Sequence, residues 1–192
     1  MYNNDLGRKL DGELGGALEH LIFNTLQAAE EKYDPDYHND SKMVADVAAL
    51  HKMGQGKILG TDERGLFKIL CSAPTEYLTK LNTLYADKHG YTLVKVLETE
   101  LGGHVEKAAL FMIGMKLKPY EEIAKLITKS CAGIGTNELL LTTTIIRYQS
   151  ILKHVNLAHV ELYGKTIRDR IDSECGGDHK RILLALIDAA DV

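Results

Sequence analysis

The chain has 192 residues, of which 45% are hydrophobic and 26% charged, and its formal net charge is −4. This length and composition allow one compact domain or two small repeat units, and they exclude a disordered or collagen-like chain. The negative balance offers no basic surplus for nucleic acid. It would also repel an anionic membrane unless a cation came between the two surfaces.

Residues 1–5 contain neither a basic region nor an apolar one, so the sequence predicts no signal peptide. No apolar run approaches the ~18 residues needed to span a bilayer. The three cysteines, Cys71, Cys131 and Cys175, are odd in number and far apart, which argues against a disulfide framework and a structural zinc site. We therefore expect a cytoplasmic protein that associates with membranes only from their surface.

A short acidic and glycine-containing phrase occurs three times. The copies are 13–16, 100–103 and 174–177, and each reads Glu-x-Gly-Gly. Before each copy, two apolar residues four positions apart share one face of a short helix. After it, apolar residues follow the i, i+3, i+4 spacing of a core-facing helix. The glycine pair fits a tight corner between these helices, where a positive φ or a close backbone approach is needed.

A second phrase, rich in glycine and followed by an apolar helix, occurs twice. It covers 56–63 (GKILGTDE) and 132–138 (AGIGTNE). In both copies a threonine, with an acidic residue two positions on, predicts a helix start with the threonine as N-cap. These residues, Thr61 and Thr136, are separated from the next Glu-x-Gly-Gly phrase by 38 and 37 residues.

The remaining pattern is also helical. The segment 31–38 is a polar linker interrupted by Pro35, and it leads into a helix predicted over 43–52. No sustained period-2 alternation and no Asn-Gly turn indicate strands. The sequence therefore predicts an all-α fold built from repeats.

The two phrases, recurring in register, resemble the annexin repeat over essentially the whole chain. That repeat carries a Gly-x-Gly-Thr-Asp-Glu loop and, nearly forty positions later, an acidic residue in a corner before the next helix. The resemblance implies annexin-like helical repeats folded as right-handed orthogonal helix bundles. It divides the chain into 1–53 (the C-terminal part of one repeat and a linker helix), 54–115 (a repeat with a glycine loop) and 116–192 (a linker helix and the last repeat).

The resemblance implies a calcium-dependent phospholipid-binding protein, peripheral and reversible on anionic membranes, and not an enzyme. Ca²⁺ prefers several oxygen ligands, and a glycine-rich loop can turn carbonyls toward one point while a distant carboxylate completes the shell. By the family pattern, the ligands are the carbonyls of Gly56, Ile58 and Gly60 with Glu100, and those of Cys131, Gly133 and Gly135 with Glu174. Ile58 stands where the pattern has its first glycine.

Three apolar residues at the loop tips, Ile58, Leu59 and Ile134, are predicted to enter the headgroup layer. Two other interpretations stay open. The glycines could be helix-terminating turns, with Glu100 and Glu174 as capping or ion-pair residues. The chain could also be an annexin-like scaffold or cytoskeletal component that has lost calcium dependence.

The family packs its repeats in pairs, the first with the fourth. The resemblance therefore implies that the last repeat, including Ile182 and Leu186, lacks its usual apolar cover, which predicts self-association or a partner chain. The calcium-site geometry would also bring Cys131 and Cys175 close together. We expect two buried, unreactive thiols there, with an oxidised pair as the alternative.

Overall fold

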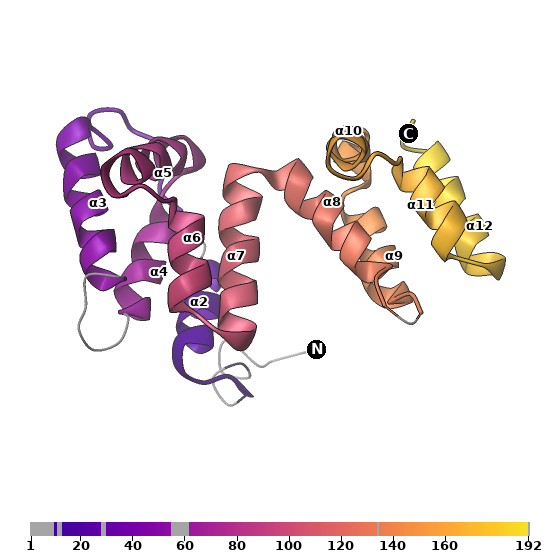
Figure 1. Ribbon diagram of the computed structural model, residues 1–192, viewed down its shortest axis with the longest axis horizontal. Coiled ribbons are helices and arrows are strands. Elements are labelled where there is room, and N and C mark those ends of the chain that lie inside the picture. The colour runs from indigo at the N-terminus through magenta and orange to yellow at the C-terminus, as the bar shows by residue number, and fades with distance from the viewer. Residues whose placement is uncertain (1–9, 11–12, 28–29, 55–61, 134, 192) are drawn as a thin grey trace. The chain divides into compact units, whose positions relative to one another are not determined.

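The computed structural model describes residues 10, 13–27, 30–54, 62–133 and 135–191. The regular structure of these residues is entirely helical (Figure 1), so the predicted all-α fold is confirmed. None of the helices described is long and apolar enough to cross a membrane. The chain divides into two compact units, Met1–Leu117 and Lys118–Val192.

The first unit is a bundle around one apolar core. Its described helices are α2 (Gly16–Leu26), α3 (Asp40–Met53), α4 (Glu63–Ser72), α5 (Thr75–His89), α6 (Leu93–Glu100) and α7 (Gly103–Leu117). α5 runs across the other helices (Figure 1), and α2 lies against α4 and α7. Fully buried side chains from all of these helices, such as Leu21, Val47 and Phe67, form the core.

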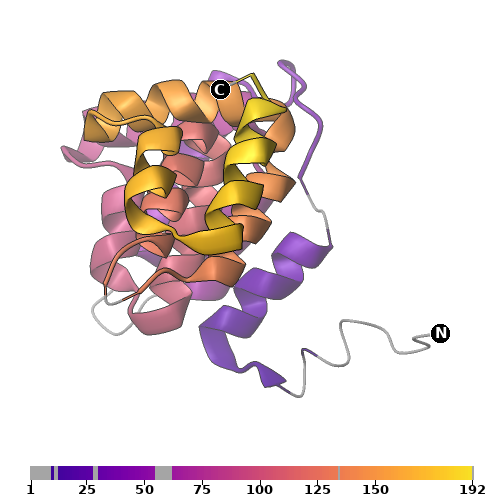
Figure 2. The ribbon, with the colours of Figure 1, turned by 90° about the vertical axis from the view of Figure 1, so that its right-hand side faces the viewer.

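The second unit repeats the order of helices from α3 to α7. It contains α8 (Pro119–Ser130), α9 (Glu138–Arg147), a short 3₁₀ turn (Gln149–Ile151), α10 (Leu152–Tyr163), α11 (Ile167–Glu174) and α12 (Gly177–Asp188). Figure 2 shows α11 and α12 side by side, with α10 crossing near one end of the pair. The sequence repeat is therefore a repeat of the helical arrangement.

The three Glu-x-Gly-Gly phrases adopt one conformation. The second glycine of each, Gly16, Gly103 and Gly177, has φ of 64°, 61° and 58°. This left-handed region is open to glycine at no steric cost, whereas a side chain there is strained. The predicted glycine corner is confirmed, and it turns the chain from one helix into the next.

The helices that follow the glycine loops start one residue later than predicted. Asp62 and Asn137 are the N-caps of α4 and α9, and each side chain accepts a hydrogen bond from the backbone N–H three residues on. The prediction of threonine caps is therefore wrong. Thr136 has another role, because its hydroxyl donates to the Glu174 carbonyl. The helix predicted over 43–52 begins earlier, at Asp40, because the Asn39 side chain caps it.

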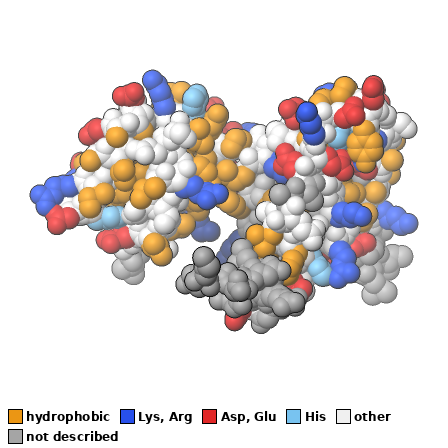
Figure 3. All heavy atoms as spheres, turned by 180° about the vertical axis from the view of Figure 1, so that it is seen from behind, with side chains coloured by type: hydrophobic (Ala, Val, Ile, Leu, Met, Phe, Trp, Pro, Cys, Tyr) orange, Lys and Arg blue, Asp and Glu red, His pale blue; other side chains and the backbone are white. Residues whose placement is uncertain are grey.

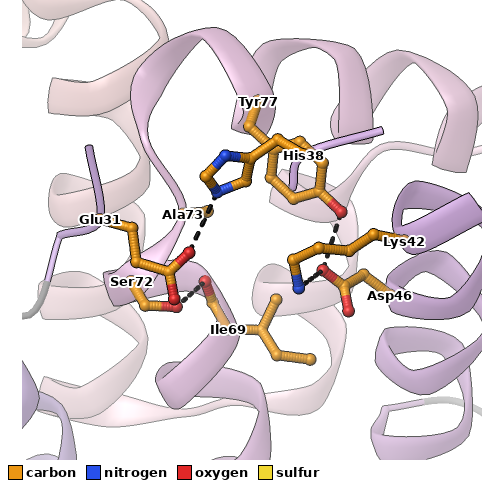
Figure 4. Close-up of a pocket in the computed structure, with 8 residues that line it drawn as sticks. All are labelled: Glu31, His38, Lys42, Asp46, Ile69, Ser72, Ala73 and Tyr77. Atoms are coloured by element: carbon orange, nitrogen blue, oxygen red, sulfur yellow. Dashed lines mark hydrogen bonds and ion pairs between the residues drawn. The ribbon is translucent and has the colours of Figure 1, made fainter. Parts of the chain in front are cut away.

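A small polar pocket fixes the linker before α3 onto the first unit. In Figure 4 the His38 ring points toward Glu31, with 3.0 Å between Nε2 and Oε2, while Asp46 accepts from Lys42 and from the Tyr77 hydroxyl. The cavity measures about 30 Å³, room for one water molecule. Because its polar groups pair with one another, we interpret the pocket as an anchor for the linker.

The second unit contains a buried histidine on α10. His159 is fully buried; its Nδ1 lies 2.6 Å from the Lys165 carbonyl oxygen, and its Nε2 lies 2.9 Å from Arg170 Nε. Nδ1–H therefore donates and Nε2 accepts, which selects the neutral ring. Burial is the largest cause that lowers the pKa of His159. The Lys165 carbonyl raises it, and the charge of Arg170 lowers it further.

We predict that the free energy of unfolding falls as the pH drops through 6.5, the ordinary pKa of histidine. The pKa of His159 is lower in the folded state, so the unfolded chain binds the proton first, and acid favours unfolding. Chemical denaturation at several pH values measures the effect. The His159→Gln variant should lose less stability on acidification than the native chain does. The control is His154→Gln: the His154 ring is exposed and stacked on Tyr120, so this variant should behave like the native chain. Identical pH profiles for the native chain and His159→Gln would contradict the assignment.

Candidate functional site

The glycine loop of the second unit is a closed turn between α8 and α9. The Asn137 N–H donates to the Ser130 carbonyl at 2.7 Å, which ties the two ends of the loop together. Within it, Gly133 and Gly135 have φ of 97° and 88°. These angles belong to glycine, and they let successive carbonyls point in directions that a regular turn does not allow.

The corner between α11 and α12 meets this loop. Glu174 is the last residue of α11, and its carbonyl accepts the Thr136 hydroxyl at 3.0 Å. The Glu174 charge also reaches the other end of the loop. Burial is the main cause that raises the pKa of the Cys131 thiol, and the Glu174 carboxylate raises it further. The structure thus brings the end of this loop into contact with the backbone of Glu174, the acidic residue that the sequence singled out in the last repeat.

The groups that could bind a cation at the loop and the corner are oxygen atoms. Among the described residues, no group donates a hydrogen bond to the carbonyls of Cys131, Gly133 or Gly135. The Glu174 side chain is exposed at the same corner. In the described ranges, no three His, Cys, Asp or Glu side chains are grouped so as to hold a metal ion. A cation here would therefore depend on backbone carbonyls and one carboxylate, the hard oxygen ligands that suit Ca²⁺.

The corresponding place in the first unit is described only at its edges. The predicted loop residues Gly56, Ile58, Leu59 and Gly60 lie outside the described residues, as does Ile134 of the second loop. The Asp62 N–H donates to the Met53 carbonyl at 2.9 Å, which joins the residues on either side of the loop.

Glu100 lies beside this junction. It is the last residue of α6, and a Cβ added at Gly54 would lie 3.9 Å from Glu100 Cγ. The first unit therefore places its predicted carboxylate next to the start of its glycine loop. Glu174 stands at the end of α11 in the same way.

The thiols at the second site are close enough to influence each other. Burial is the largest cause that raises the pKa of Cys175, and the neighbouring Cys131 is the next. Both cysteines are free, as is Cys71. A raised pKa leaves little thiolate at neutral pH, so these side chains are poor nucleophiles. Cys131 is buried as expected, whereas Cys175 is only partly buried, so the expectation of two buried thiols is wrong for Cys175.

Sequence reasoning missed the role of Thr136. The residue was interpreted as a helix cap, whereas it fastens the loop to the corner. A signal for this was present in the nearly constant separation between the threonine and the following Glu-x-Gly-Gly phrase in both repeats. A fixed spacing between two loops is expected when the loops touch.

Comparisons with known proteins agree with this geometry. The annexin family model matches residues 45–112 and 122–186. The chain is 27% identical over 187 residues to annexin A7 of Dictyostelium discoideum, with 97% of this chain and 40% of that protein covered. It is 28% identical over 192 residues to annexin A5 of Cynops pyrrhogaster, with 99% and 58% covered. A solved structure of calcium-bound annexin (Sm)1 superposes with a TM-score of 0.82 at 22% identity, covering 97% of this chain and 54% of the other.

The chain belongs to the annexin family, because the family model covers well over half of it. The predicted annexin-like helical repeats are confirmed by the structural superposition. The chain spans only about half the length of these relatives.

We predict that Thr136→Val loosens the junction between loop and corner. Loss of one hydrogen bond of this kind costs about 1 kcal/mol in the free energy of unfolding. Chemical denaturation measures the loss, and hydrogen exchange should speed up for the amides near 136 and 174. Thr143→Val is the matched control, because that hydroxyl bonds only within α9. Equal stability of the two variants would contradict the role of Thr136.

Proposed function

We propose that this chain binds anionic phospholipid membranes reversibly and peripherally, in a calcium-dependent manner, on the cytoplasmic side of the cell. The observation that carries the proposal is the meeting of the glycine loop with Glu174. There, the Thr136 hydroxyl donates to the Glu174 carbonyl, and the Glu174 side chain is exposed. Among the described residues, the carbonyls of Cys131, Gly133 and Gly135 accept no backbone hydrogen bond. The fold likeness to an annexin whose structure contains calcium supports it.

The proposed ligands in the second unit are the carbonyls of Cys131, Gly133 and Gly135 with the carboxylate of Glu174. Those in the first unit are the carbonyls of Gly56, Ile58 and Gly60 with Glu100. The positive φ of Gly133 and Gly135 orients the carbonyls, and Thr136 holds the corner at hydrogen-bond distance. When bound, Ca²⁺ supplies positive charge between these oxygens and a lipid phosphate.

Calcium binding would also overcome the electrostatic repulsion between the chain and an anionic membrane. With a formal net charge of −4, the protein and an anionic surface repel each other. Binding then has to wait for a cation, and it ends when the cation leaves. Ile58, Leu59 and Ile134 would add apolar contact at the headgroup layer. This role requires binding groups and no catalytic residue.

We predict that the chain pellets with phosphatidylserine vesicles in the presence of calcium and stays in solution with chelator. Glu174→Gln and Glu100→Gln should each raise the calcium concentration needed for half-maximal binding about tenfold, equivalent to ~1.4 kcal/mol. The amide keeps the shape of the side chain but removes the charged, bidentate ligand. The measurement is co-sedimentation across a calcium titration.

The matched control is Glu161→Gln, which removes an exposed carboxylate of α10 that belongs to neither loop and neither corner. It should leave the titration unchanged. Pelleting that is the same with calcium and with chelator would overturn the proposal in favour of a calcium-independent scaffold role. No pelleting under either condition would overturn membrane binding itself.

A further inference from the structure

Three residues join the two ends of the glycine loop in the first unit. Met53 is the last residue of α3, and its carbonyl accepts the Asp62 N–H at 2.9 Å. The Asp62 side chain caps α4 by accepting a hydrogen bond from the Gly65 N–H at 3.1 Å. We call this junction of Met53, Asp62 and Gly65 the neck of the loop.

The Met53 side chain lies in the space that a side chain at Gly65 would take. A Cβ added at Gly65 would lie 2.8 Å from Met53 Sδ and 3.1 Å from Met53 Cε. The same Cβ would lie 3.2 Å from Asp62 Oδ2. The sulfur therefore packs on bare backbone and borders the space beside the capping carboxylate. An atom added to the sulfur on this side has no room.

The second unit fills the equivalent positions in the opposite way. The Asn137 N–H donates to the Ser130 carbonyl, and the Asn137 side chain accepts from the Leu140 N–H. Ser130 thus corresponds to Met53, and Leu140 corresponds to Gly65. One unit has the large residue before the loop and the small one in the helix, and the other unit has the reverse. Such an exchange of volumes is expected where two positions share one space in a close-packed structure.

The Met53 side chain is partly exposed, so a small oxidant in solution can reach it. Exposure alone does not single it out, because hydrophobic side chains appear at many places on the surface in Figure 3. What distinguishes Met53 is that its sulfur packs on Gly65 while its carbonyl holds Asp62. A chemical change at this sulfur therefore acts directly on the neck.

We infer that Met53 is an oxidation site at which a peroxide opens the neck of the first glycine loop. In this step hydrogen peroxide transfers one oxygen atom to Sδ. The S–O bond forms as the O–O bond breaks, the sulfur is oxidised to the sulfoxide, and the peroxide is reduced to water. The product is a polar side chain in place of a flexible apolar one.

The neck does not suit the oxidised side chain. The sulfoxide oxygen is a hydrogen-bond acceptor that carries partial negative charge, and the Asp62 carboxylate beside it offers only acceptor oxygens. The added oxygen also needs volume that the contact with Gly65 does not leave. The oxidised side chain therefore has to move away from α4, which weakens the hydrogen bond between the Met53 carbonyl and Asp62.

The same movement reaches the proposed calcium ligand of the first unit. Gly54 follows Met53 directly, and a Cβ added there would lie 3.9 Å from Glu100 Cγ. Oxidation of Met53 therefore raises the calcium concentration needed for membrane binding, a consequence that rests on the proposed function. Methionine sulfoxide reductases return the sulfoxide to the thioether, so the change is reversible.

The first test measures amide hydrogen exchange and needs neither calcium nor lipid. The full chain is treated with hydrogen peroxide and then with dithiothreitol, which reduces oxidised thiols and leaves the sulfoxide in place. Mass spectrometry of peptides should find Met53 oxidised. The amides of Asp62 and Gly65 should then exchange about fivefold faster, as expected for the loss of one hydrogen bond.

The second unit provides an internal control, because residues 118–192 contain no methionine. The amides of Asn137 and Leu140, which hold the equivalent positions, should exchange at the same rate before and after the treatment.

Three variants assign the effect to one side chain. Met53→Leu keeps an apolar side chain of similar volume without the sulfur, so peroxide should leave its exchange unchanged. Met115→Leu removes a partly buried methionine of α7 and is the matched control, which should respond as the native chain does. Met53→Gln, a polar side chain of similar length, should show the faster exchange without peroxide. Circular dichroism checks that each variant keeps its helices.

The second test repeats the calcium titration with phosphatidylserine vesicles. The oxidised native chain should need about fivefold more calcium for half-maximal pelleting, equivalent to ~1 kcal/mol. A methionine sulfoxide reductase should reverse the shift. The shift should persist in Glu174→Gln and disappear in Glu100→Gln, which already lacks the carboxylate of the first unit.

Unchanged exchange at Asp62 and Gly65 in a chain with fully oxidised Met53 would overturn the inference. An equal response of Met53→Leu and the native chain would do the same, as would a Met53 that stays unoxidised while Met115 is converted. Faster exchange with an unchanged calcium titration would disprove the link between the neck and the calcium site. Failure of the unoxidised chain to pellet with calcium would count against the proposed function alone, because the exchange measurement decides the role of Met53 without it.

Discussion

The hydrogen bond from the Thr136 hydroxyl to the Glu174 carbonyl joins two segments that are far apart along the chain. It fixes the glycine loop against the corner, together with the contacts that His179 of α12 makes with Thr142 and Glu138 of α9. The end of the loop therefore lies next to Glu174, the last residue of α11. The candidate site is therefore a property of a contact between two loops, and each loop is shaped by glycines that adopt a positive φ.

The helices around this contact serve to hold the two loops in position. α11 is a short helix with a capping box at Thr166 and Asp169, and it ends at Glu174. α9 starts at the residue after Asn137, whose side chain caps it. The contact between loop and corner is thus flanked by two well-defined helix ends, the start of α9 and the end of α11. A cation site built from carbonyls needs such rigid boundaries, because backbone oxygens cannot adjust their position independently of the chain.

Repetition explains both the similarity and the difference between the two units. The same buried positions recur in α4 and α9 and in α7 and α12, because each repeat has to fill the same core. The outer positions differ. Leu21 of α2 is buried against α4 and α7, whereas Ile182, at the equivalent place on α12, is exposed. A repeat buries its inner face by itself, but its outer face depends on what lies against it.

The sequence by itself determined the helical class, the repeat and the glycine corners. These follow from local physics: apolar spacing selects helices, and a glycine pair between two amphipathic helices indicates a positive φ. It also pointed to Glu174 and the loop residues, through spacing in two repeats. Only the tertiary structure decided that Thr136 bonds the corner instead of capping α9, because both roles suit a threonine before a helix. The exposure of Leu139, Ile146 and Ile182 was likewise decided in three dimensions. The apolar spacing along a helix is the same whether the residue packs within its own unit, against another repeat or against another chain.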